Sequence, residues 1–388
     1  MKTVLVLLLT LFTLSACDQA SLAQQRSEQL AAQSGEITVA VAWPLTSSKA
    51  TLAKGVQLAA DEINSGGGIL GGRKLKLLFK DDAGSLSTGR QVAQEIANDP
   101  GVAAVIGHLN SYITAPASLI YERAGLLMIT PGASGQKVTE QGGKLVFRSL
   151  PGNRDQGRQI GDYAAAQGYR RVAIYYIKND YGVDLANCFE QRAHELGMTV
   201  VDRQSYDMGG GDRSITLRNW AAFLKIDAIF FVGSLPEGGQ IMRDMRAAGL
   251  QMPVFGGAGL DSPDLIKLGG PSVNGTVVFS LFNQNDPHPD VLAFGQRYQA
   301  RYGKLPDATA AQGYDTLKLL AHAMTAARST APIEVAAALR ATRDWRGVTG
   351  LHTFDLKGDL IAKQLAKVVV NNGKFEPFAS QPPVSYRP

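Results

Sequence analysis

From Glu36 onward, short apolar runs alternate with longer stretches in which apolar residues recur every three or four positions. The short runs predict β-strands, and the longer stretches predict amphipathic α-helices. The predicted strands are residues 37–42, 74–80, 102–107, 126–130, 171–177, 199–206, 228–232 and 254–256. The helices predicted among them are residues 52–63, 86–98, 111–124, 154–167, 181–196, 213–224 and 237–248.

Strands separated by helices of about ten to fifteen residues are typical of parallel βαβ units. A second series begins after Pro151, so the pattern predicts an α/β protein with two doubly wound parallel sheets. Ligands of such folds bind outside the carboxyl ends of the strands. The C-terminal part differs, with helices predicted at 289–302, 309–328 and 333–342 and a hairpin of 350–354 with 362–370, turned at 357–359.

The N-terminus predicts export and a lipid anchor. The segment Val4–Leu14 is apolar except for two threonines, which is too short to span a membrane but suits a signal peptide over residues 1–16. The order Leu14-Ser15-Ala16-Cys17 resembles the bacterial lipobox, so Cys17 is expected to be lipidated and to become the new N-terminus. Ordinary secretory cleavage beside an incidental cysteine is the alternative.

The expected location is therefore the periplasm or cell envelope, with the chain tethered to a membrane. Asp18 resembles an inner-membrane retention signal, if the host is Gram-negative and sorts lipoproteins in that way. Residues 17–35 are rich in Gln, Ser and Ala and are expected to form a flexible tether.

Composition and motifs argue against several other classes. The 39 Lys and Arg against 34 Asp and Glu are spread along the chain, which does not favour nucleic-acid binding. The five histidines lack metal-ligand spacing, and Cys188 is expected to be a buried structural thiol. The glycine-rich segment Gly66–Gly71 fits G-x-G-x-x-G, but it follows a helix and precedes a strand, so it predicts a turn and not a dinucleotide site. No enzyme activity, metal or cofactor is expected.

Motifs in a fixed order carry a family resemblance. They are LAADEIN at 58–64, DD at 81–82, VIGHLNS at 105–111, MITPGAS at 128–134, DYG at 180–182 and RAAGL at 246–250. Together they resemble the periplasmic leucine/isoleucine/valine-binding proteins. The resemblance implies a type I periplasmic binding fold, with two lobes joined by a hinge of three crossings. It divides the chain into an N-terminal lobe (36–150 and 283–354) and a C-terminal lobe (151–282 and 355–380).

The resemblance also implies a ligand site in the cleft. Ser111 matches a serine whose hydroxyl, together with a helix N-terminus, holds the ligand carboxylate; a plain N-cap is the alternative. Gly132 and Ser134 match an alanine and a threonine that contact the ligand, with turn residues as the alternative. Tyr181 matches a tyrosine of the second lobe that closes over the ligand, or it is a packing residue.

Several positions depart from the family. Ala258 stands where the family has the glutamate that pairs with the ligand's ammonium, and Ser234 stands in place of a tyrosine. Asp261 is the nearest substitute acid along the chain, although it could instead cap a helix. Trp43 either forms an aromatic wall of the cleft or caps the core, and Tyr112 could narrow the pocket.

These observations predict a lipid-anchored, monomeric solute-binding protein of an ABC importer of the branched-chain amino acid type. Its partners would be the membrane permease subunits and a small carboxylate-bearing ligand, either an amino acid or a related organic acid or amide. An ammonium buried without its carboxylate partner costs about 3–5 kcal/mol, so leucine, isoleucine and valine are expected to bind weakly. A ligand-sensing protein for a membrane receptor or regulator is the alternative.

Overall fold

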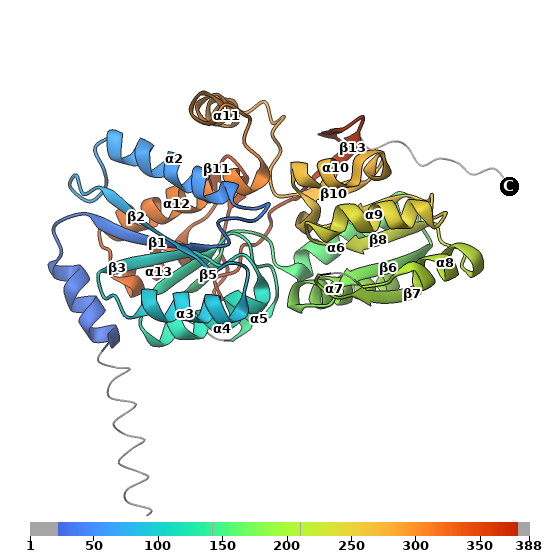
Figure 1. Ribbon diagram of the computed structural model, residues 1–388. Helices are drawn as coiled ribbons and strands as arrows, with labels where there is room; N and C mark the ends of the chain where they lie inside the picture. Colours follow the sequence, from blue (N-terminus) through green and yellow to red (C-terminus); the bar gives the residue numbers. More distant parts are fainter. Residues whose placement is uncertain (1–21, 142, 210, 379–388) are drawn as a thin grey trace, which may run out of the picture.

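The computed structural model describes residues 22–141, 143–209 and 211–378 of the 388-residue chain. These residues form two α/β lobes that lie side by side (Figure 1). The predicted signal peptide and Cys17 lie outside the described residues. Within the described ranges, no helix is both long enough and apolar enough to cross a membrane.

The N-terminal lobe is built on a five-stranded parallel sheet of order β2-β1-β3-β4-β5. Its strands are β1 (Ile37–Trp43), β2 (Leu75–Asp81), β3 (Val102–Gly107), β4 (Leu127–Thr130) and β5 (Val146–Arg148). Its helices are α2 (Thr51–Ser65), α3 (Leu86–Ala97), α4 (Ser111–Arg123), α5 (Lys137–Glu140), α11 (Pro289–Tyr302), α12 (Ala308–Ala327) and α13 (Pro332–Ala341).

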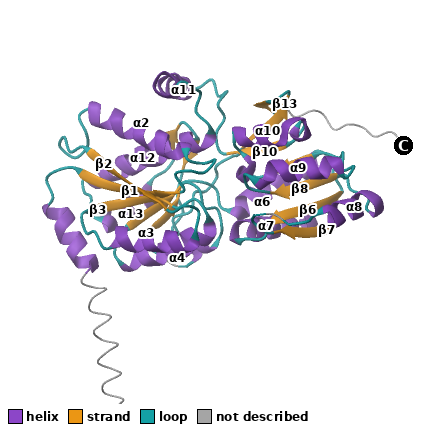
Figure 2. Cartoon of the chain, in the orientation of Figure 1, coloured by secondary structure: helices purple, strands orange, loops and turns teal. Residues whose placement is uncertain are grey.

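Two apolar cores flank this sheet. Side chains of α2, α12 and α13 fill one face, and side chains of α3 and α4 fill the other. Figure 2 shows α2 and α12 above the sheet and α3 and α4 below it. Every residue of β3 is buried, because a parallel sheet covered on both faces leaves no side of a central strand in water. This explains why the strand appears in the sequence as a continuous apolar run.

The C-terminal lobe contains a seven-stranded sheet of order β14-β13-β10-β9-β8-β6-β7. Its parallel strands are β6 (Arg171–Ile177), β7 (Thr199–Tyr206), β8 (Ala228–Val232), β9 (Val254–Gly256) and β10 (Val277–Ser280). β13 (Ala366–Asn371) and β14 (Lys374–Pro377) complete one edge in antiparallel pairing. The helices are α6 (Asn153–Ala166), α7 (Asp180–Glu195), α8 (Ser214–Phe223), α9 (Glu237–Ala247), α10 (Pro263–Gly269) and the short η1 (Ala258–Leu260) and η2 (Gly270–Val273).

Three segments connect the lobes. The first joins β5 to α6, the second joins β10 to α11, and the third leads from the N-terminal lobe into β13. In the third segment, Leu360 packs in the core of the N-terminal lobe and Leu365 in the core of the C-terminal lobe. This crossing therefore lies after residue 360, later than the boundary at 354 expected from the resemblance.

The predicted C-terminal hairpin is wrong. β12 (Gly350–His352) pairs with β11 (Trp345–Gly347), whereas β13 pairs with β10 and β14. A turn does form at residues 357–359, but it closes a single bridge between Phe354 and Leu360. The apolar run of β13 instead extends the sheet of the C-terminal lobe at the edge that β10 offers.

The expected tether is also wrong over most of its length, because residues 22–32 form a helix. Arg26 of this helix is fully buried, and its guanidinium donates hydrogen bonds to the carbonyls of Ala97 (2.7 Å), Asp99 (2.9 Å) and Ala124. Leu30 joins the core of the N-terminal lobe. The Gln, Ser and Ala composition concealed an amphipathic helix docked on the lobe.

Two smaller predictions can be compared with the structure. The glycine-rich segment does form a turn, since α2 ends at Ser65 and an Ile69–Arg73 bridge precedes β2. Cys188 of α7 is half-buried rather than fully buried, and its free thiol has its pKa raised to about 12 by burial and by Asp184.

Candidate functional site

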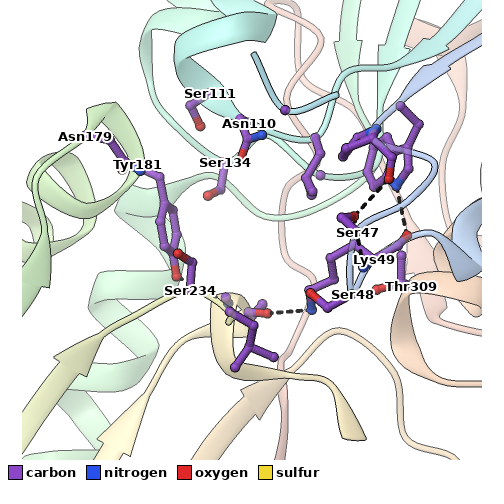
Figure 3. Close-up of a pocket in the computed structure, with 18 of the residues that line it drawn as sticks. Ser47, Ser48, Lys49, Asn110, Ser111, Ser134, Asn179, Tyr181, Ser234 and Thr309 are labelled. Carbon is purple, nitrogen blue, oxygen red and sulfur yellow. Dashed lines mark hydrogen bonds between the residues drawn. The ribbon is translucent and has the colours of Figure 1, made fainter. Parts of the chain in front are cut away.

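A cavity of about 430 Å³ lies between the lobes, at the carboxyl ends of strands from both sheets. Of the nine residues expected at a ligand site, the structure brings eight together on its wall: Trp43, Ser111, Tyr112, Gly132, Ser134, Tyr181, Ser234 and Ala258. The ninth, Asp261, is not among the lining residues. Figure 3 shows serines of the N-terminal lobe facing Tyr181 and Ser234 of the C-terminal lobe.

Ser111 is the first residue of α4, and Asn110 occupies the N-cap position. The alternative of Ser111 as a plain N-cap is therefore wrong. Its hydroxyl accepts a hydrogen bond from the Gly135 amide (3.1 Å), and its side chain is almost fully buried. The first amides of a helix have no partner within the helix, and its dipole is positive at this end. This end of the cavity can therefore bind a carboxylate.

A buried histidine holds the loop that leads into α4. His108 follows β3 directly, and its ring bonds the carboxylate of Asp82 (2.7 Å) and the hydroxyl of Tyr121 (3.0 Å). The Thr130 hydroxyl donates to the His108 carbonyl (2.7 Å). These contacts tie the ends of three strands to the loop before α4 and, through Tyr121, to the last turn of α4, so both ends of the helix that begins at Ser111 are held by the core.

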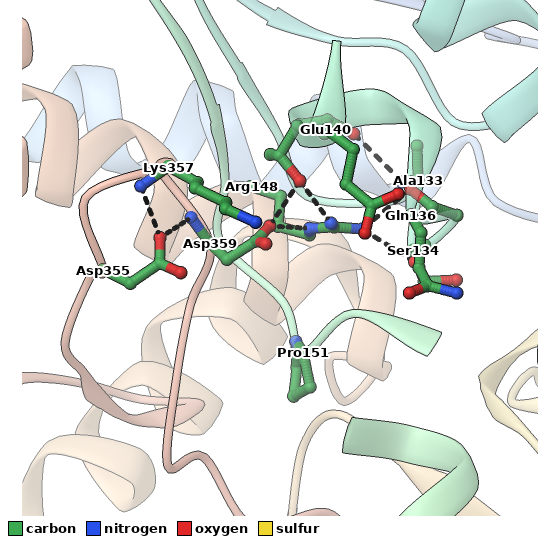
Figure 4. Close-up of polar contacts among 12 residues, drawn as sticks. Ala133, Ser134, Gln136, Glu140, Arg148, Pro151, Asp355, Lys357 and Asp359 are labelled. Carbon is green, nitrogen blue, oxygen red and sulfur yellow. Dashed lines mark hydrogen bonds and ion pairs between the residues drawn. The ribbon is translucent and has the colours of Figure 1, made fainter. Parts of the chain in front are cut away.

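Ser134 lines the cavity, and its backbone carbonyl is held by two hydrogen bonds. That carbonyl accepts hydrogen bonds from Arg148 Nη1 (2.7 Å) and from the Asn153 amide (2.8 Å). Arg148 also bonds the Gly135 carbonyl (2.9 Å) and the carboxylate of Asp359 in the third connecting segment (Figure 4). The buried guanidinium thus joins the floor of the site to the hinge, a role that sequence reasoning missed.

Trp43 both lines the cavity and packs in the core of the N-terminal lobe, so its two alternative roles coexist. A Cβ atom on Gly132 would lie 2.6 Å from Cη2 of Trp43 and 2.9 Å from Cα of Leu109. Glycine is therefore required at 132 for the indole to lie where it does. Tyr112 also lines the cavity, and its hydroxyl donates to the Gly84 carbonyl (2.7 Å).

The opposite wall belongs to the C-terminal lobe. Tyr181, in the first turn of α7, accepts a hydrogen bond from the Gly259 amide (3.3 Å), and burial raises its pKa to about 12. Ser234 follows β8, and its amide donates to the Tyr206 hydroxyl (3.2 Å). Glu237 also lines the cavity and accepts a hydrogen bond from the Gly209 amide (3.1 Å).

Lys49 is the principal site residue that sequence reasoning missed. It lies in the loop between β1 and α2, and its ammonium crosses the cleft to the carbonyls of Asp261 (2.5 Å) and Ala258 (3.2 Å). Burial lowers the pKa of Lys49, and nearby carboxylates, above all that of Asp261, partly offset this effect. The contact joins residues more than 200 positions apart in the sequence, so no local pattern could have predicted it.

Asp261 does not take the place of the missing family glutamate. Its side chain is buried, and the residue lines a separate neighbouring cavity of about 200 Å³. Burial raises the pKa of its carboxyl, while Lys49 lowers it. Asp261 is therefore a counter-charge for Lys49 and is not placed to meet a ligand in the main cavity.

A second contact joins the lobes beside the cavity. The amide and the side chain of Gln136, in the N-terminal lobe, donate to the carboxylate of Asp184 in α7 (3.0 and 2.7 Å). Asn153, at the start of α6, donates to the same carboxylate (2.8 Å). Together with Lys49, this contact holds the two lobes against each other around the cavity.

Two parallel-sheet lobes with three connecting segments and a cavity of ligand size between them define the class of two-lobe solute-binding proteins. Within the described ranges, no cluster of three His, Cys, Asp or Glu side chains could hold a metal ion. The model of the periplasmic binding protein family matches residues 36–374. The chain belongs to this family, in its leucine/isoleucine/valine-binding branch, whose members are solute-binding proteins and not enzymes.

Individual relatives agree with this assignment. The chain is 34% identical to Leu/Ile/Val-binding protein homolog 2 of Brucella abortus, covering 84% of this chain and 87% of the relative. An ABC transporter substrate-binding protein of Desulfitobacterium hafniense, solved in complex with Leu, is 37% identical with a TM-score of 0.79, covering 88% of this chain and all of that one. A leucine-binding protein of Thermotoga maritima is 29% identical with a TM-score of 0.83, and the match covers 88% of this chain and 98% of that one.

Proposed function

We propose that this protein is a lipid-anchored solute-binding protein that captures a small carboxylate-bearing ligand and delivers it to an ABC importer. The observation that carries the proposal is the meeting of Ser111, Ser134 and the N-terminus of α4 at one end of the cavity. These groups provide hydroxyl donors and unpaired amides at the positive end of a helix dipole.

Capture would couple to closure because the cavity wall comes from both lobes. A ligand that touches both walls stabilises the closed arrangement, and the permease recognises that arrangement. Micromolar affinity needs about 8 kcal/mol of net binding free energy. A cavity of about 430 Å³ with a carboxylate-binding end and apolar walls is large enough for such a ligand.

Anchoring rests on the sequence around Cys17, which lies outside the described residues. The acyl chains of a lipidated cysteine would hold the protein at the membrane, since each buried methylene contributes about 0.8 kcal/mol. Family membership supports a location in the periplasm beside the permease subunits.

The Desulfitobacterium relative was solved with Leu bound, so a branched-chain amino acid is the first ligand to test. Ala258 stands where the family resemblance places the glutamate that pairs with the ammonium, and we therefore expect leucine to bind weakly here. Thermal-shift screening of amino acids, amides and organic acids, followed by titration calorimetry, would identify the ligand.

The test of the carboxylate site is Ser111→Ala, with Ser118→Ala as the matched control in the same helix. Ser118 is buried, and its hydroxyl donates to the Ala115 carbonyl (2.8 Å) within α4, away from the cavity. We expect Ser111→Ala to weaken carboxylate binding by about 1–3 kcal/mol and Ser118→Ala to leave the affinity unchanged. Unaltered affinity in Ser111→Ala would show that the carboxylate binds elsewhere.

A further inference from the structure

The ammonium group of Lys49 lies at the end of the cavity where the family resemblance places an acid. Lys49 reaches into the cavity from the N-terminal lobe (Figure 3). Its Nζ lies 3.2 Å from the carbonyl of Ala258, the residue that stands in place of that acid. A leucine-type ligand would present its own ammonium toward this position. Two cations would then share a buried space, and their repulsion is strong because little water screens it.

Lys49 also has hydrogen-bonding capacity left for a ligand. An ammonium carries three N–H donors. Among the described residues, its acceptors are the carbonyls of Ala258 and Asp261. The third donor is therefore available to an acceptor in the cavity that Lys49 lines.

The charges around the cavity favour an acceptor over an ammonium at this end. Lys49 and Glu237 are the charged side chains among the described residues that line it. Asp261, the counter-charge of Lys49, lies outside the cavity wall, as do Asp264 and Asp307, whose charges also reach the ammonium. Glu237, which is half-exposed and accepts a hydrogen bond from the Gly209 amide, is the one acid among the described lining residues that could meet a ligand ammonium.

We propose that Lys49 determines the specificity of the site by presenting a hydrogen-bond donor where leucine-binding relatives need an acid. The ligand is then a small carboxylic acid whose second polar group is an acceptor, such as a 2-oxo or 2-hydroxy acid, and not an α-amino acid. This inference rests on the proposed function, because it assumes that the carboxylate binds at Ser111 and Ser134.

The test compares matched pairs of ligands that differ only at the second carbon. We would measure binding of leucine with 4-methyl-2-oxopentanoate, phenylalanine with phenylpyruvate, glutamate with 2-oxoglutarate and alanine with pyruvate, by titration calorimetry on the purified protein. In the pair that binds most tightly, we expect the oxo acid to bind roughly 10- to 100-fold more tightly, the range of a hydrogen bond to a charged group.

Variants then assign the preference to Lys49. Lys49→Met should weaken oxo-acid binding and remove the preference, whereas Lys54→Met, at an exposed lysine of α2 that does not line the cavity, should leave both unchanged. Lys49→Gln keeps an N–H donor without the charge, and we expect it to retain part of the preference. Melting curves without ligand would establish that each variant is folded. If Lys49→Met does not fold, the ligand preference of Lys49→Gln is compared with that of the unmodified protein instead.

Tighter binding of the amino acid in the best pair, or an unchanged preference in a folded Lys49 variant, would overturn the inference and leave the proposed function standing. Loss of amino-acid binding in Glu237→Gln would also overturn the inference, because it would identify Glu237 as the partner of a ligand ammonium. The proposed function would again stand. If no carboxylate of any pair binds, the proposed function itself fails.

Discussion

Replacing Arg148 with methionine would test whether the floor of the ligand site depends on the hinge. The side chain is buried at the end of β5, and its guanidinium donates to the Ser134 and Gly135 carbonyls, to the Thr139 hydroxyl (2.6 Å) and to Asp359. Methionine replaces the aliphatic stem of the arginine and ends near the position of Nε, so the change removes the guanidinium with its charge and its hydrogen bonds.

The loss of stability in Arg148→Met depends on which hydrogen bonds the partners of Arg148 keep. Breaking a buried ion pair by removing one member costs about 3–5 kcal/mol of unfolding free energy. Asp359 is 23% exposed and keeps a hydrogen bond from the Thr139 hydroxyl (2.8 Å), and the Ser134 carbonyl keeps its bond from Asn153. We therefore expect a loss near the lower end, about 3 kcal/mol. For a domain of this size, that loss corresponds to a fall in Tm of about 6–12 °C.

The control is Arg154→Met, because Arg154 contacts the same loop from the surface. Its side chain is 75% exposed and pairs with Glu140 (3.3 Å), so its loss should cost less than about 1 kcal/mol. Urea unfolding would give the stabilities, and calorimetry would give the ligand affinities, which we expect to fall only in Arg148→Met. Equal stabilities in the two variants, or unchanged affinity in Arg148→Met, would refute the positioning role.

Three further predictions test the anchor, the Trp43 wall and the response to acid. Cys17→Ser should move the protein from the membrane to the soluble fraction, and unchanged fractionation would disprove lipidation. Gly132→Ala should displace Trp43 and cost about 1–3 kcal/mol with weaker ligand binding, whereas Gly295→Ala, which has open space around it, should cost nothing. Burial, reinforced by Lys363, keeps the pKa of His352 well below 6.5, so below that pH the unfolded chain binds a proton that the folded chain does not. Stability should therefore fall as pH drops from 6.5 to 5.5, and His352→Gln should lose about 1 kcal/mol less in urea unfolding across that interval.

The parallel core of each lobe could be predicted because its signal is local. Strands such as Val102–Gly107 and Arg171–Ile177 have the bounds that the apolar runs indicate. The hairpin prediction failed because pairing of β13 is decided by the free edge of β10, about 90 residues earlier in the chain. The helix at 22–32 was missed because composition outweighed the spacing of Ala23, Arg26 and Leu30, which places these three side chains on one helical face.

The residues of the candidate site also fall into two groups, those that a local sequence pattern places and those whose position depends on long-range contacts. Ser111 and Ser134 each come four residues after the end of a strand, β3 and β4 respectively, so local patterns are enough to place them at the carboxyl edge of the sheet. Lys49 and Asp261 are different, because their contact depends on how one lobe meets the other. The sequence marks neither residue with a local pattern, so only the structure could decide whether Asp261, the nearest substitute acid along the chain, lies in the main cavity.

Two departures from the family explain each other in physical terms. The resemblance places an alanine where this chain has Gly132, and a Cβ atom there would lie 2.6 Å from the Trp43 ring. The indole therefore needs the glycine, and in its position it donates a hydrogen bond through Nε1 to the Lys49 carbonyl (2.9 Å). That bond fixes the backbone from which the Lys49 ammonium reaches Ala258 across the cleft. Trp43, Gly132 and Lys49 thus form one connected set of contacts, which links the shape of the carboxylate end of the cavity to the position of the charge at its opposite end.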